Sequence, residues 1–317
     1  MKENLKIAVA RLYYFEDKNQ NEIASELKIS RSYVSKLLVE ARKEKLIEFR
    51  SNNIWLMENE KERILKRHFH LDKVVIADDK SSYQQDTYPY TQQLGEKLGS
   101  LLNSILKDGD VIGVAWGKTI YDCSRYLRTD KSLKNVKVVQ ICGGVTQNQK
   151  RTYADEISKN FADVYKANVY AMMVPAIVES KQYKEIFFQE QCISQVVKML
   201  DNINVAVFTV GQCSMESSLV KSGFITEKEI KTLISEGAVG EVCTRFINKD
   251  GQCVSETLDD RTMAISFQQL QRCDYRIAVI LGKQRLEPLK AILHAGYANI
   301  LLIDEKTADV LLEEIKM

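Results

Sequence analysis

The sequence lacks close cysteine pairs, has few histidines and contains no long apolar run. Its seven cysteines lie at least ten residues apart, so we expect reduced thiols and neither a metal knuckle nor a redox dithiol. His68 and His70, two of only three histidines, stand two residues apart on an expected helix and therefore point to different faces. No run approaches the roughly 18 apolar residues that span a bilayer. These absences predict a protein with no metal, no cofactor and no membrane contact.

The beginning of the chain also lacks the features of a signal peptide. The stretch MKENLKIAVARLYY has no uncharged core followed by small residues at a cleavage position, so we expect a cytoplasmic protein. With 45% hydrophobic and 28% charged residues, the composition is that of an ordinary globular protein, which excludes global disorder. At roughly 100 to 200 residues per domain, a chain of 317 residues predicts two domains.

The charges nearly balance over the whole chain, but one segment near its beginning is basic. The net charge is +2, whereas seven basic and three acidic residues lie between Lys28 and Arg50. Such a segment suits contact with nucleic acid, and a solvated helix face has a similar composition. Charge alone therefore leaves both interpretations open.

The first 50 residues show the periodicity of three helices. Apolar residues from Leu5 to Leu12 recur at helical spacing, and a polar break precedes a short helix over 20–27. Ser30 is placed to cap the next helix, whose apolar stripe runs from Val34 to Ala41. The short helix, the tight turn and the third helix with a basic outer face have the spacing of a helix-turn-helix.

In a helix-turn-helix, outer residues near the start of the last helix meet base edges in the major groove, which is about 12 Å wide. We therefore predict a DNA-binding surface formed by Gln20, Ser30, Arg31, Ser32, Tyr33, Ser35, Lys36, Lys43 and Arg50. The alternative is a generic three-helix bundle, which gives no reason for an outward Arg-Ser-Tyr-x-Ser-Lys sequence after a tight turn. Lys28 departs from the pattern, because glycine would most easily supply a positive φ at its turn position.

Two further stretches lie between the helices and the rest of the chain. The stretch LIEFRSNNIWLM, residues 46–57, alternates well enough to predict two short strands around an Asn-Asn tip, which would form a wing. A plain linker strand is the alternative. The charged stretch from Glu58 to His70 predicts an amphipathic connecting helix.

From Lys73 onward, short apolar strands alternate with helical stretches. Strands are predicted at VVIAD, VIGVAW, KVVQIC, VAVFTVG, RIAVILG and NILLID. This alternation predicts a Rossmann-like α/β domain with a mostly parallel sheet between layers of helices. In such folds, ligands bind at the carboxyl ends of the strands.

Four of these strands end in glycine, with a basic, hydroxyl-bearing or amide-bearing residue close behind. The residues concerned are Gly117, Lys118, Thr119, Gly143, Gly144, Thr146, Gly211, Gln212, Gly282 and Lys283. Glycine lets backbone amides approach an anion at such a turn. Helix–strand packing explains any single glycine equally well, but four at equivalent strand ends favour a phosphate-bearing small molecule.

Six stretches carry a resemblance to a known family, and they follow one order along the whole chain: QNEIASELKISRSYVSKLLVEAR, DGDVIGVAWGKTIY, VVQICGG, AVGEVCTRFINKDGQ, DDRTMAISFQQL and YANILLIDEKTADVLL. Together they resemble the SorC family of sugar-responsive bacterial transcriptional regulators, in particular its deoxyribonucleoside-regulator-like members. The resemblance implies an effector domain similar to sugar-phosphate isomerases and deaminases, a homo-oligomer that is usually a tetramer, and a carbohydrate or polyol catabolic operon as target. We therefore expect a winged helix-turn-helix DNA-binding domain at 1–57, a linker helix at 58–72, and an effector-binding and oligomerisation domain at 73–317.

The resemblance also implies residue roles. It places the phosphate cradle at Gly117, Lys118, Thr119, Gly143, Gly144 and Thr146. Cys142 stands where the deoxyribonucleoside regulator has the lysine that forms a Schiff base, which excludes a covalent imine there. Glu241 stands where many relatives have aspartate, and Arg285 where a lysine is frequent, so hydrogen bonding and positive charge are kept. The departures predict a phosphorylated sugar or polyol other than deoxyribose phosphate.

Two other functions are considered as alternatives to a ligand-controlled regulator. Glu241, Asp259 and Asp260 could act as bases of a sugar-phosphate isomerase or deaminase, but the sequence assigns no acid–base pair to one site. Solvated carboxylates are the simpler explanation for the two aspartates. DNA binding without any small ligand would leave the glycine series without a role. We therefore predict a regulator and no enzyme, with double-stranded operator DNA and the effector as partners.

Overall fold

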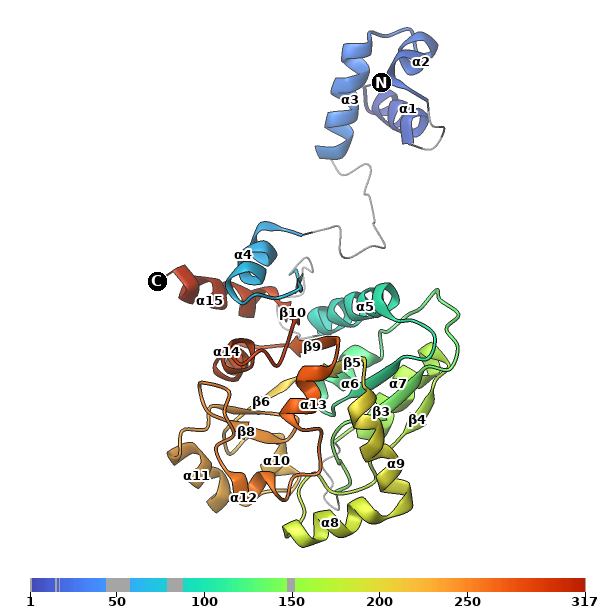
Figure 1. Cartoon of the computed structure of the whole chain (residues 1–317). Helices are drawn as coiled ribbons and strands as arrows, with labels where there is room; N and C mark the ends of the chain where they lie inside the picture. The colour runs from blue at the N-terminus through green and yellow to red at the C-terminus, as the bar shows by residue number, and fades with distance from the viewer. Residues whose placement is uncertain are drawn as a thin grey trace. The chain divides into compact units, whose positions relative to one another are not determined.

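The computed structural model describes residues 2–14, 16, 18–43, 58–78, 88–146 and 152–316. The chain divides into two compact units, residues 1–52 and 53–317, which we describe separately (Figure 1). The wing predicted at 46–57 lies outside the described residues, as does Arg50, and only the backbone of Lys43 is described.

The described residues of the small unit form three helices: α1 (Lys2–Tyr14), α2 (Gln20–Glu26) and α3 (Arg31–Lys43). Their apolar stripes meet in one core, in which Val9, Ile23, Val34 and Leu37 are completely buried. Burial of these stripes, rather than intrinsic propensity, stabilises helices as short as α2. The three predicted helices and their helix-turn-helix arrangement are confirmed.

A seven-stranded sheet organises the large unit. Its strands are β1 (Lys73–Ala77), β2 (Val111–Val114), β3 (Lys137–Gln140), β4 (Asn168–Tyr170), β5 (Val205–Phe208), β9 (Tyr275–Ile280) and β10 (Ile300–Asp304). The order across the sheet is β1-β10-β9-β5-β2-β3-β4, and every neighbouring pair is parallel. The parallel sheet predicted from the alternation of strands and helices is confirmed.

Helices cover both faces of this sheet, because successive strand residues point to opposite sides. In β1, Val74 and Ile76 pack into one apolar core, whereas Val75 and Ala77 pack into the other. The core of Val75 is covered by α5 (Tyr88–Ile105), α6 (Lys118–Ser124) and α7 (Ala154–Tyr165). The core of Val74 is covered by α4 (Glu60–His68), α9 (Gln191–Met199), α13 (Phe267–Arg272), α14 (Leu286–His294) and α15 (Glu305–Lys316).

A second, antiparallel sheet follows directly on the main one, and the sequence did not predict it. It consists of β6 (Val210–Gln212), β7 (Gly240–Val242) and β8 (Arg245–Ile247), in that order. The helices α10 (Ser218–Lys221), α11 (Glu227–Ser235) and α12 (Glu256–Asp259) share an apolar core with β8. Only Thr209 separates β5 from β6, so this sheet begins at the carboxyl end of a central strand. The other helical segments are α8 (Lys181–Gln189), η1 (Leu200–Asn202) and η2 (Lys283–Arg285).

Candidate DNA-binding surface and effector site

The start of α3 has the local structure that the sequence predicts. The backbone N–H of Tyr33 donates to the Ser30 hydroxyl oxygen at 3.2 Å, which satisfies one of the amides left open at the first turn. Lys28, in the preceding turn, has a φ of 53°. A lysine therefore adopts the left-handed conformation for which glycine was expected.

The side chains predicted to meet DNA differ in exposure. Arg31, Ser32 and Lys36 are exposed on the first turns of α3, and Ser35 is partly exposed. Gln20 begins α2 and is also partly exposed. Tyr33 instead packs its ring against the apolar core of the small unit. The basic and hydroxyl-bearing groups of α3 thus form a polar surface, which we call the α3 surface: Arg31, Ser32, Ser35 and Lys36.

The four predicted glycine loops follow four neighbouring strands of the main sheet. Gly282 after β9, Gly117 after β2 and Gly143–Gly144 after β3 lie in turns, whereas Gly211 is the middle residue of strand β6, which follows β5. Parallel strands present their carboxyl ends at one edge, so these loops share that edge. An added Cβ at Gly117 would lie 3.4 Å from Cγ2 of Thr209, the residue after β5. The sheet therefore brings together turns that lie far apart in the sequence.

This edge contains the switch point of the fold. From β2 the chain passes to β3 and β4 on one side, and β5 returns to the other side of β2. Open α/β sheets bind ligands where the strand order reverses in this way. Gly117 lies directly before α6 in the turn after β2, and Gly211 lies in β6, directly after β5 and Thr209. The two glycines thus follow the two strands between which the strand order reverses.

Close packing also requires several of these glycines. A Cβ at Gly143 would lie 2.4 Å from the backbone oxygen of Pro175, and one at Gly144 would lie 2.9 Å from Cβ of Ala154. The indole N–H of Trp116 donates to the Gly143 carbonyl at 2.8 Å and so joins two of the loops. Close packing, which is the alternative explanation for a single glycine, therefore accounts for the glycines at positions 143 and 144.

The polar residues behind the glycines have different surroundings. The ammonium group of Lys118 lies 2.5 Å from a carboxylate oxygen of Asp122, with the lysine side chain 74% exposed. Lys283 is exposed, whereas Thr119 is buried. The Gln212 side-chain amide donates to the Ser214 hydroxyl at 2.8 Å. An exposed ion pair is weak, so the ammonium group of Lys118 can turn toward an anion at little cost.

Glu241 lies over Gly211, where an added Cβ would clash with its carboxylate. One carboxylate oxygen accepts the backbone N–H of Thr244 at 2.9 Å. Burial raises the pKa of Glu241 to about 7, against the opposing effects of that hydrogen bond and of the positive charge of Arg285. Near neutral pH this carboxyl group can accept a hydrogen bond from a hydroxyl group, or donate one to it.

Arg285 is held by backbone oxygens rather than standing open to solvent. Its Nε donates to the Val210 carbonyl at 2.9 Å, and its Nη1 donates to the Leu281 carbonyl. Burial lowers the pKa of Arg285, opposed by the negative charges of Glu241 and Asp304. The guanidinium group therefore joins β6 to the end of β9 and brings positive charge to the site.

Cys142 is buried after β3, and it neighbours a second cysteine. A hydrogen bond with Cys142 is the main cause that raises the pKa of the Cys243 thiol, and burial of the thiol raises it further. Cys243 and Thr244 form the turn between β7 and β8, with φ angles of 49° and 71°. Two consecutive positive φ values are typical of a type I′ hairpin, although neither residue is glycine.

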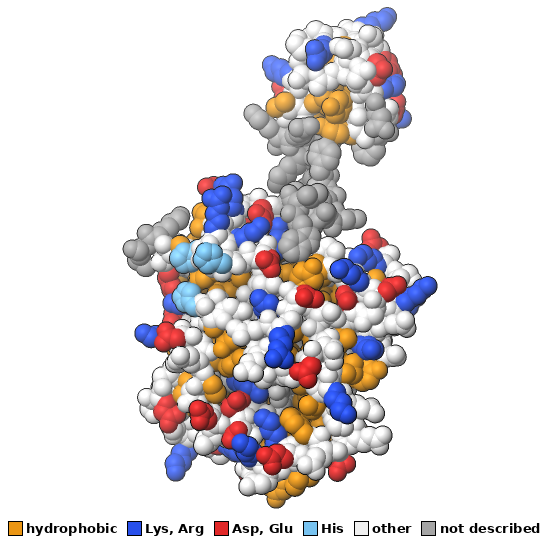
Figure 2. Space-filling view, in the orientation of Figure 1, with side chains coloured by type: hydrophobic (Ala, Val, Ile, Leu, Met, Phe, Trp, Pro, Cys, Tyr) orange, Lys and Arg blue, Asp and Glu red, His pale blue; other side chains and the backbone are white. Residues whose placement is uncertain are grey.

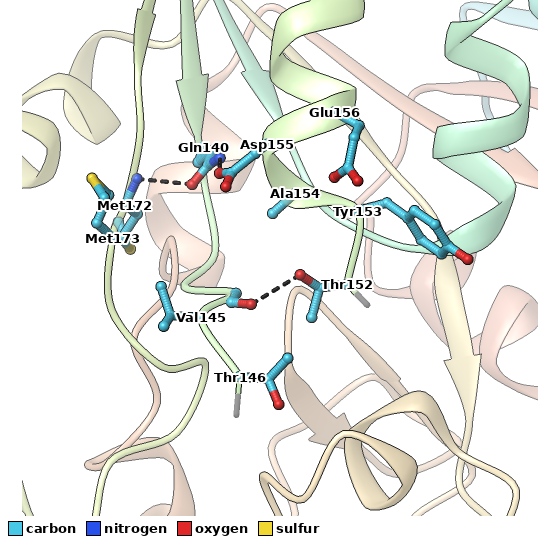
Figure 3. A pocket seen from close by; sticks show the side chains of 11 residues that line it. Gln140, Val145, Thr146, Thr152, Tyr153, Ala154, Asp155, Glu156, Met172 and Met173 are labelled. Atoms are coloured by element: carbon cyan, nitrogen blue, oxygen red, sulfur yellow. Dashed lines mark hydrogen bonds between the residues drawn. The ribbon is translucent and has the colours of Figure 1, made fainter. Parts of the chain in front are cut away.

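A pocket of about 310 Å³ lies beside these loops, between the end of β3 and the start of α7 (Figure 3). Of the predicted effector residues, Gly144 and Thr146 line it. The other lining residues were not predicted: Gln140, Val145, Thr152, Tyr153, Ala154, Asp155, Glu156, Met172 and Met173.

Gln140 organises one wall of this pocket. Its side-chain amide donates to Asp155 at 3.0 Å, and its amide oxygen accepts the backbone N–H of Met172 at 2.9 Å (Figure 3). On the other wall, the Thr152 hydroxyl donates to the Gly144 carbonyl at 2.9 Å. A polar residue at the end of the apolar strand KVVQ was the sequence signal that would have indicated Gln140.

Other kinds of site are not indicated within the described part of the chain. No group of three or more His, Cys, Asp or Glu side chains could hold a metal there, and no helix there is long and apolar enough to cross a membrane. On the face of the large unit that Figure 2 shows, Lys and Arg are interspersed with Asp and Glu. Attraction of an anion to this face therefore depends on local groups.

Comparison with known proteins agrees with the two-part architecture. The family described as "Putative sugar-binding domain" matches residues 56–313, and "Sigma-70, region 4" matches residues 8–44. The chain is 30% identical over 314 residues to the deoxyribonucleoside regulator of Bacillus subtilis (strain 168), covering 99% of each chain. It is 25% identical over 313 residues to the sorbitol operon regulator of Klebsiella pneumoniae, covering 97% of each.

A solved structure extends the comparison to three dimensions. The crystal structure of the full-length sorbitol operon regulator SorC from Klebsiella pneumoniae matches with a TM-score of 0.72 at 25% identity, covering 98% of both chains. Sequence and fold thus agree over nearly the whole length, and the relatives are transcriptional regulators rather than enzymes. The chain belongs to the SorC/DeoR-like family of sugar-binding transcriptional regulators, and it is a DNA-binding regulator and not an enzyme.

Proposed function

We propose that the chain controls a carbohydrate or polyol catabolic operon in the cytoplasm, by binding operator DNA and a phosphorylated sugar or polyol. One observation carries the proposal: glycine turns follow β9, β2 and β3, and Gly211 follows β5, so four neighbouring parallel strands place glycines at the switch point of the sheet. Backbone amides at such turns hold phosphate groups, and a sheet edge of this kind is where α/β folds bind small molecules.

Operator binding is assigned to the α3 surface. Arg31 and Lys36 are exposed and carry positive charge, and Ser32 and Ser35 add hydroxyl groups beside them. Arginine reads guanine through two hydrogen bonds in the major groove, whereas contacts to phosphate supply affinity that falls with salt. Gln20, Lys43 and Arg50 are proposed as phosphate contacts, and Ser30 acts through its cap on α3.

The phosphate of the effector is assigned to the loops after β2 and β3. The backbone amides near Gly117 and Gly144, the ammonium group of Lys118 and the hydroxyl of Thr146 would surround it. Lys118 reaches this position by leaving Asp122, and Lys283 supplies a second exposed cation after β9. The positive charge of Arg285 adds to the field, although two of its donors already bind backbone oxygens.

The hydroxyl groups of the effector are assigned to Glu241 and Gln212. Glu241 has a pKa of about 7 and lies against Gly211, so it can exchange hydrogen bonds with a sugar or polyol. Cys142 provides no amine, so binding is proposed to be noncovalent at that position. These features favour an effector other than deoxyribose phosphate, although a relative is a deoxyribonucleoside regulator.

The effector is proposed to act by shifting a population. A ligand changes operator affinity only if it binds the DNA-competent arrangement with a different affinity, and a coupling of about 1 to 3 kcal/mol is typical. A homo-oligomer would place two α3 helices in successive major grooves about 34 Å apart. A small rotation between protomers would then disengage one helix.

The full-length chain and a panel of phosphorylated and unphosphorylated sugars and polyols test the proposal. A ligand that binds only the folded protein stabilises it, by about 2.7 kcal/mol at 100 times its Kd. We expect at least one phosphorylated compound to raise the melting temperature and to change binding to genomic DNA fragments selected by the chain. Its unphosphorylated counterpart is the matched control. A panel in which no phosphorylated compound alters either measurement would contradict the proposed effector class.

A further inference from the structure

The helix α4 is the first described element that follows the small unit along the chain. Side chains at its beginning contact strand β1 of the main sheet. The carboxylate of Glu62 is buried and accepts the backbone N–H of Ile76, in β1, at 2.8 Å. Its other oxygen accepts the backbone N–H of Asn59 at 2.9 Å, within the capping box that begins α4. Glu58 in turn lies 3.5 Å from the ammonium group of buried Lys73 at the start of β1.

Lys61 joins the same helix to two carboxylates of α15, beside the apolar core that the two helices share. The ammonium group of Lys61 lies 2.9 Å from a carboxylate oxygen of Glu305 and 2.6 Å from one of Asp309, one turn further along α15. These two carboxylates raise the pKa of Lys61, so the lysine stays charged. The first turns of α15 and the beginning of α4 are therefore joined by a three-charge contact, which we call the Lys61 clamp.

The start of α15 is also joined to the glycine turn after β9. Asp304, which directly precedes α15, is buried and accepts the backbone N–H of Gly282 at 2.8 Å. The same carboxylate accepts the backbone N–H of Thr307 at 3.0 Å and the Thr307 hydroxyl at 2.6 Å, and so caps α15. One buried carboxylate thus fixes both the start of α15 and the turn at Gly282.

The turn at Gly282 has little freedom to change without moving Asp304. Gly282 has a φ of 98°, a conformation that other residues rarely adopt, and it leads into Lys283 and Arg285. An anion bound at this turn would compete with Asp304 for backbone donors, or would move the turn relative to β10. Either change reaches the first turn of α15, on which Glu305 of the Lys61 clamp lies.

We infer that Asp304 and Lys61 are positioning residues that couple the effector loop at Gly282 to α4, with the first two turns of α15 as the connecting element. The inference deepens the proposed function and rests on it, because it gives the route by which an effector would reach the helix that leads toward the DNA-binding unit. The path is short, since Gly282, Asp304, α15 and Lys61 follow one another by direct hydrogen bonds and ion pairs.

Amide hydrogen exchange on the ligand-free, full-length chain tests this coupling, with exchange of the Gly282 and Thr307 amides as the readout. Lys61→Met removes the clamp and leaves Asp304 in place. We expect it to speed exchange at Gly282 by at least about fivefold, the lower end of typical coupling between sites. Arg63→Met, an exposed position on the same helix, is the matched control and should leave exchange at Gly282 unchanged.

A second variant approaches the clamp from the other side. Glu305→Gln with Asp309→Asn removes both carboxylates from α15 without touching α4, and should speed exchange at Gly282 as Lys61→Met does. Faster exchange confined to α4 and to the clamped turn of α15, with Gly282 unaffected in both variants, would overturn the inference. The measurement needs no effector or DNA, so failure of the proposed regulator function would appear separately, in the ligand panel and the DNA selection.

Discussion

The α3 surface and the effector site differ in how their residues come together. The residues of the α3 surface all lie within six positions of one another. They belong to one helix, whose first turn is capped by the side chain of Ser30. The effector site draws its residues from positions between Gly117 and Arg285 and depends on the strand order of the main sheet. A local surface can therefore change without disturbing the fold, whereas the effector site and the core of the large unit are built from the same turns.

The largest effect that this comparison predicts is at Gly143. Gly143→Val would place side-chain carbon where the backbone oxygens of Val174 and Pro175 already lie, within 2.7 Å of an added Cβ. Because neither oxygen belongs to a flexible side chain, we expect the free energy of unfolding of the large unit to fall by about 3 kcal/mol. Urea denaturation of the full chain measures it, with Val145→Leu, at an exposed neighbouring position, as the control.

Unchanged stability of Gly143→Val would show that the turn after β3 can relax. The effector site would then be as independent of the core as the α3 surface, and the contrast between the two regions would be lost.

Arg31→Ala is the corresponding change in the local surface. It should weaken operator binding by about 2 kcal/mol if Arg31 reads a guanine, while the free energy of unfolding stays the same. Fluorescence anisotropy with a selected genomic fragment at fixed salt measures the effect. Arg11→Ala removes an exposed arginine from α1 and serves as the charge-matched control. Equal operator affinity in both variants would remove Arg31 from the DNA contacts.

Because of Glu241, we expect the free energy of unfolding of the large unit to depend on pH. Its pKa is about 7 in the folded chain and about 4.3 in an unfolded one, so the folded state favours the protonated form. The resulting stability is fully present below about pH 4.3 and is lost as the pH rises through 7, by about 2 kcal/mol after allowing for contact with solvent. Glu241→Gln keeps an acceptor for Thr244 and should lack this loss in urea denaturation at a series of pH values.

The test is the difference between wild type and variant, because other carboxylates titrate in the opposite direction. Hydrogen bonding to Lys66, for example, lowers the pKa of Glu58. Parallel stability profiles for wild type and Glu241→Gln between pH 4 and 8 would contradict a raised pKa of half-buried Glu241. Glu236→Gln, at an exposed position, is the control.

The smallest of these effects is expected at Lys118. Lys118→Ala removes one charge-assisted contact to the effector phosphate, so we expect effector affinity to fall about tenfold while operator affinity is kept. Thermal shift and DNA binding with the compound identified from the panel measure it. Lys228→Ala, an exposed lysine of α11, should respond as wild type. A normal effector response in Lys118→Ala would place the phosphate elsewhere.

The sequence predicted most where structure is local or repeated. The three helices, the Ser30 cap and the glycine turns after β2, β3 and β9 follow from periodicity and residue chemistry, and the structure agrees, whereas Gly211 lies inside β6. It did not predict β6, β7 and β8, because these strands have three residues each and their hairpin turn is formed by Cys243 and Thr244 without glycine. Nor could the sequence show that Arg285 would donate hydrogen bonds to the carbonyl oxygens of Val210 and Leu281, because such contacts depend on how distant segments pack.

The pocket beside β3 shows the same limit. Gln140 and Asp155 lie on different elements and meet only because α7 packs next to the end of β3. The predicted roles of individual residues in DNA and effector binding stay predictions.

The most direct test of the account is operator binding by the full-length chain with and without the phosphorylated compound found in the panel, together with binding of that compound with and without operator. Linkage requires the two ratios to be equal. We expect a change of about 5- to 150-fold in both ratios. Lys118→Ala should need about ten times more of the compound to reach it, whereas Lys228→Ala should need as much as wild type. Operator affinity that no phosphorylated sugar or polyol alters would contradict it.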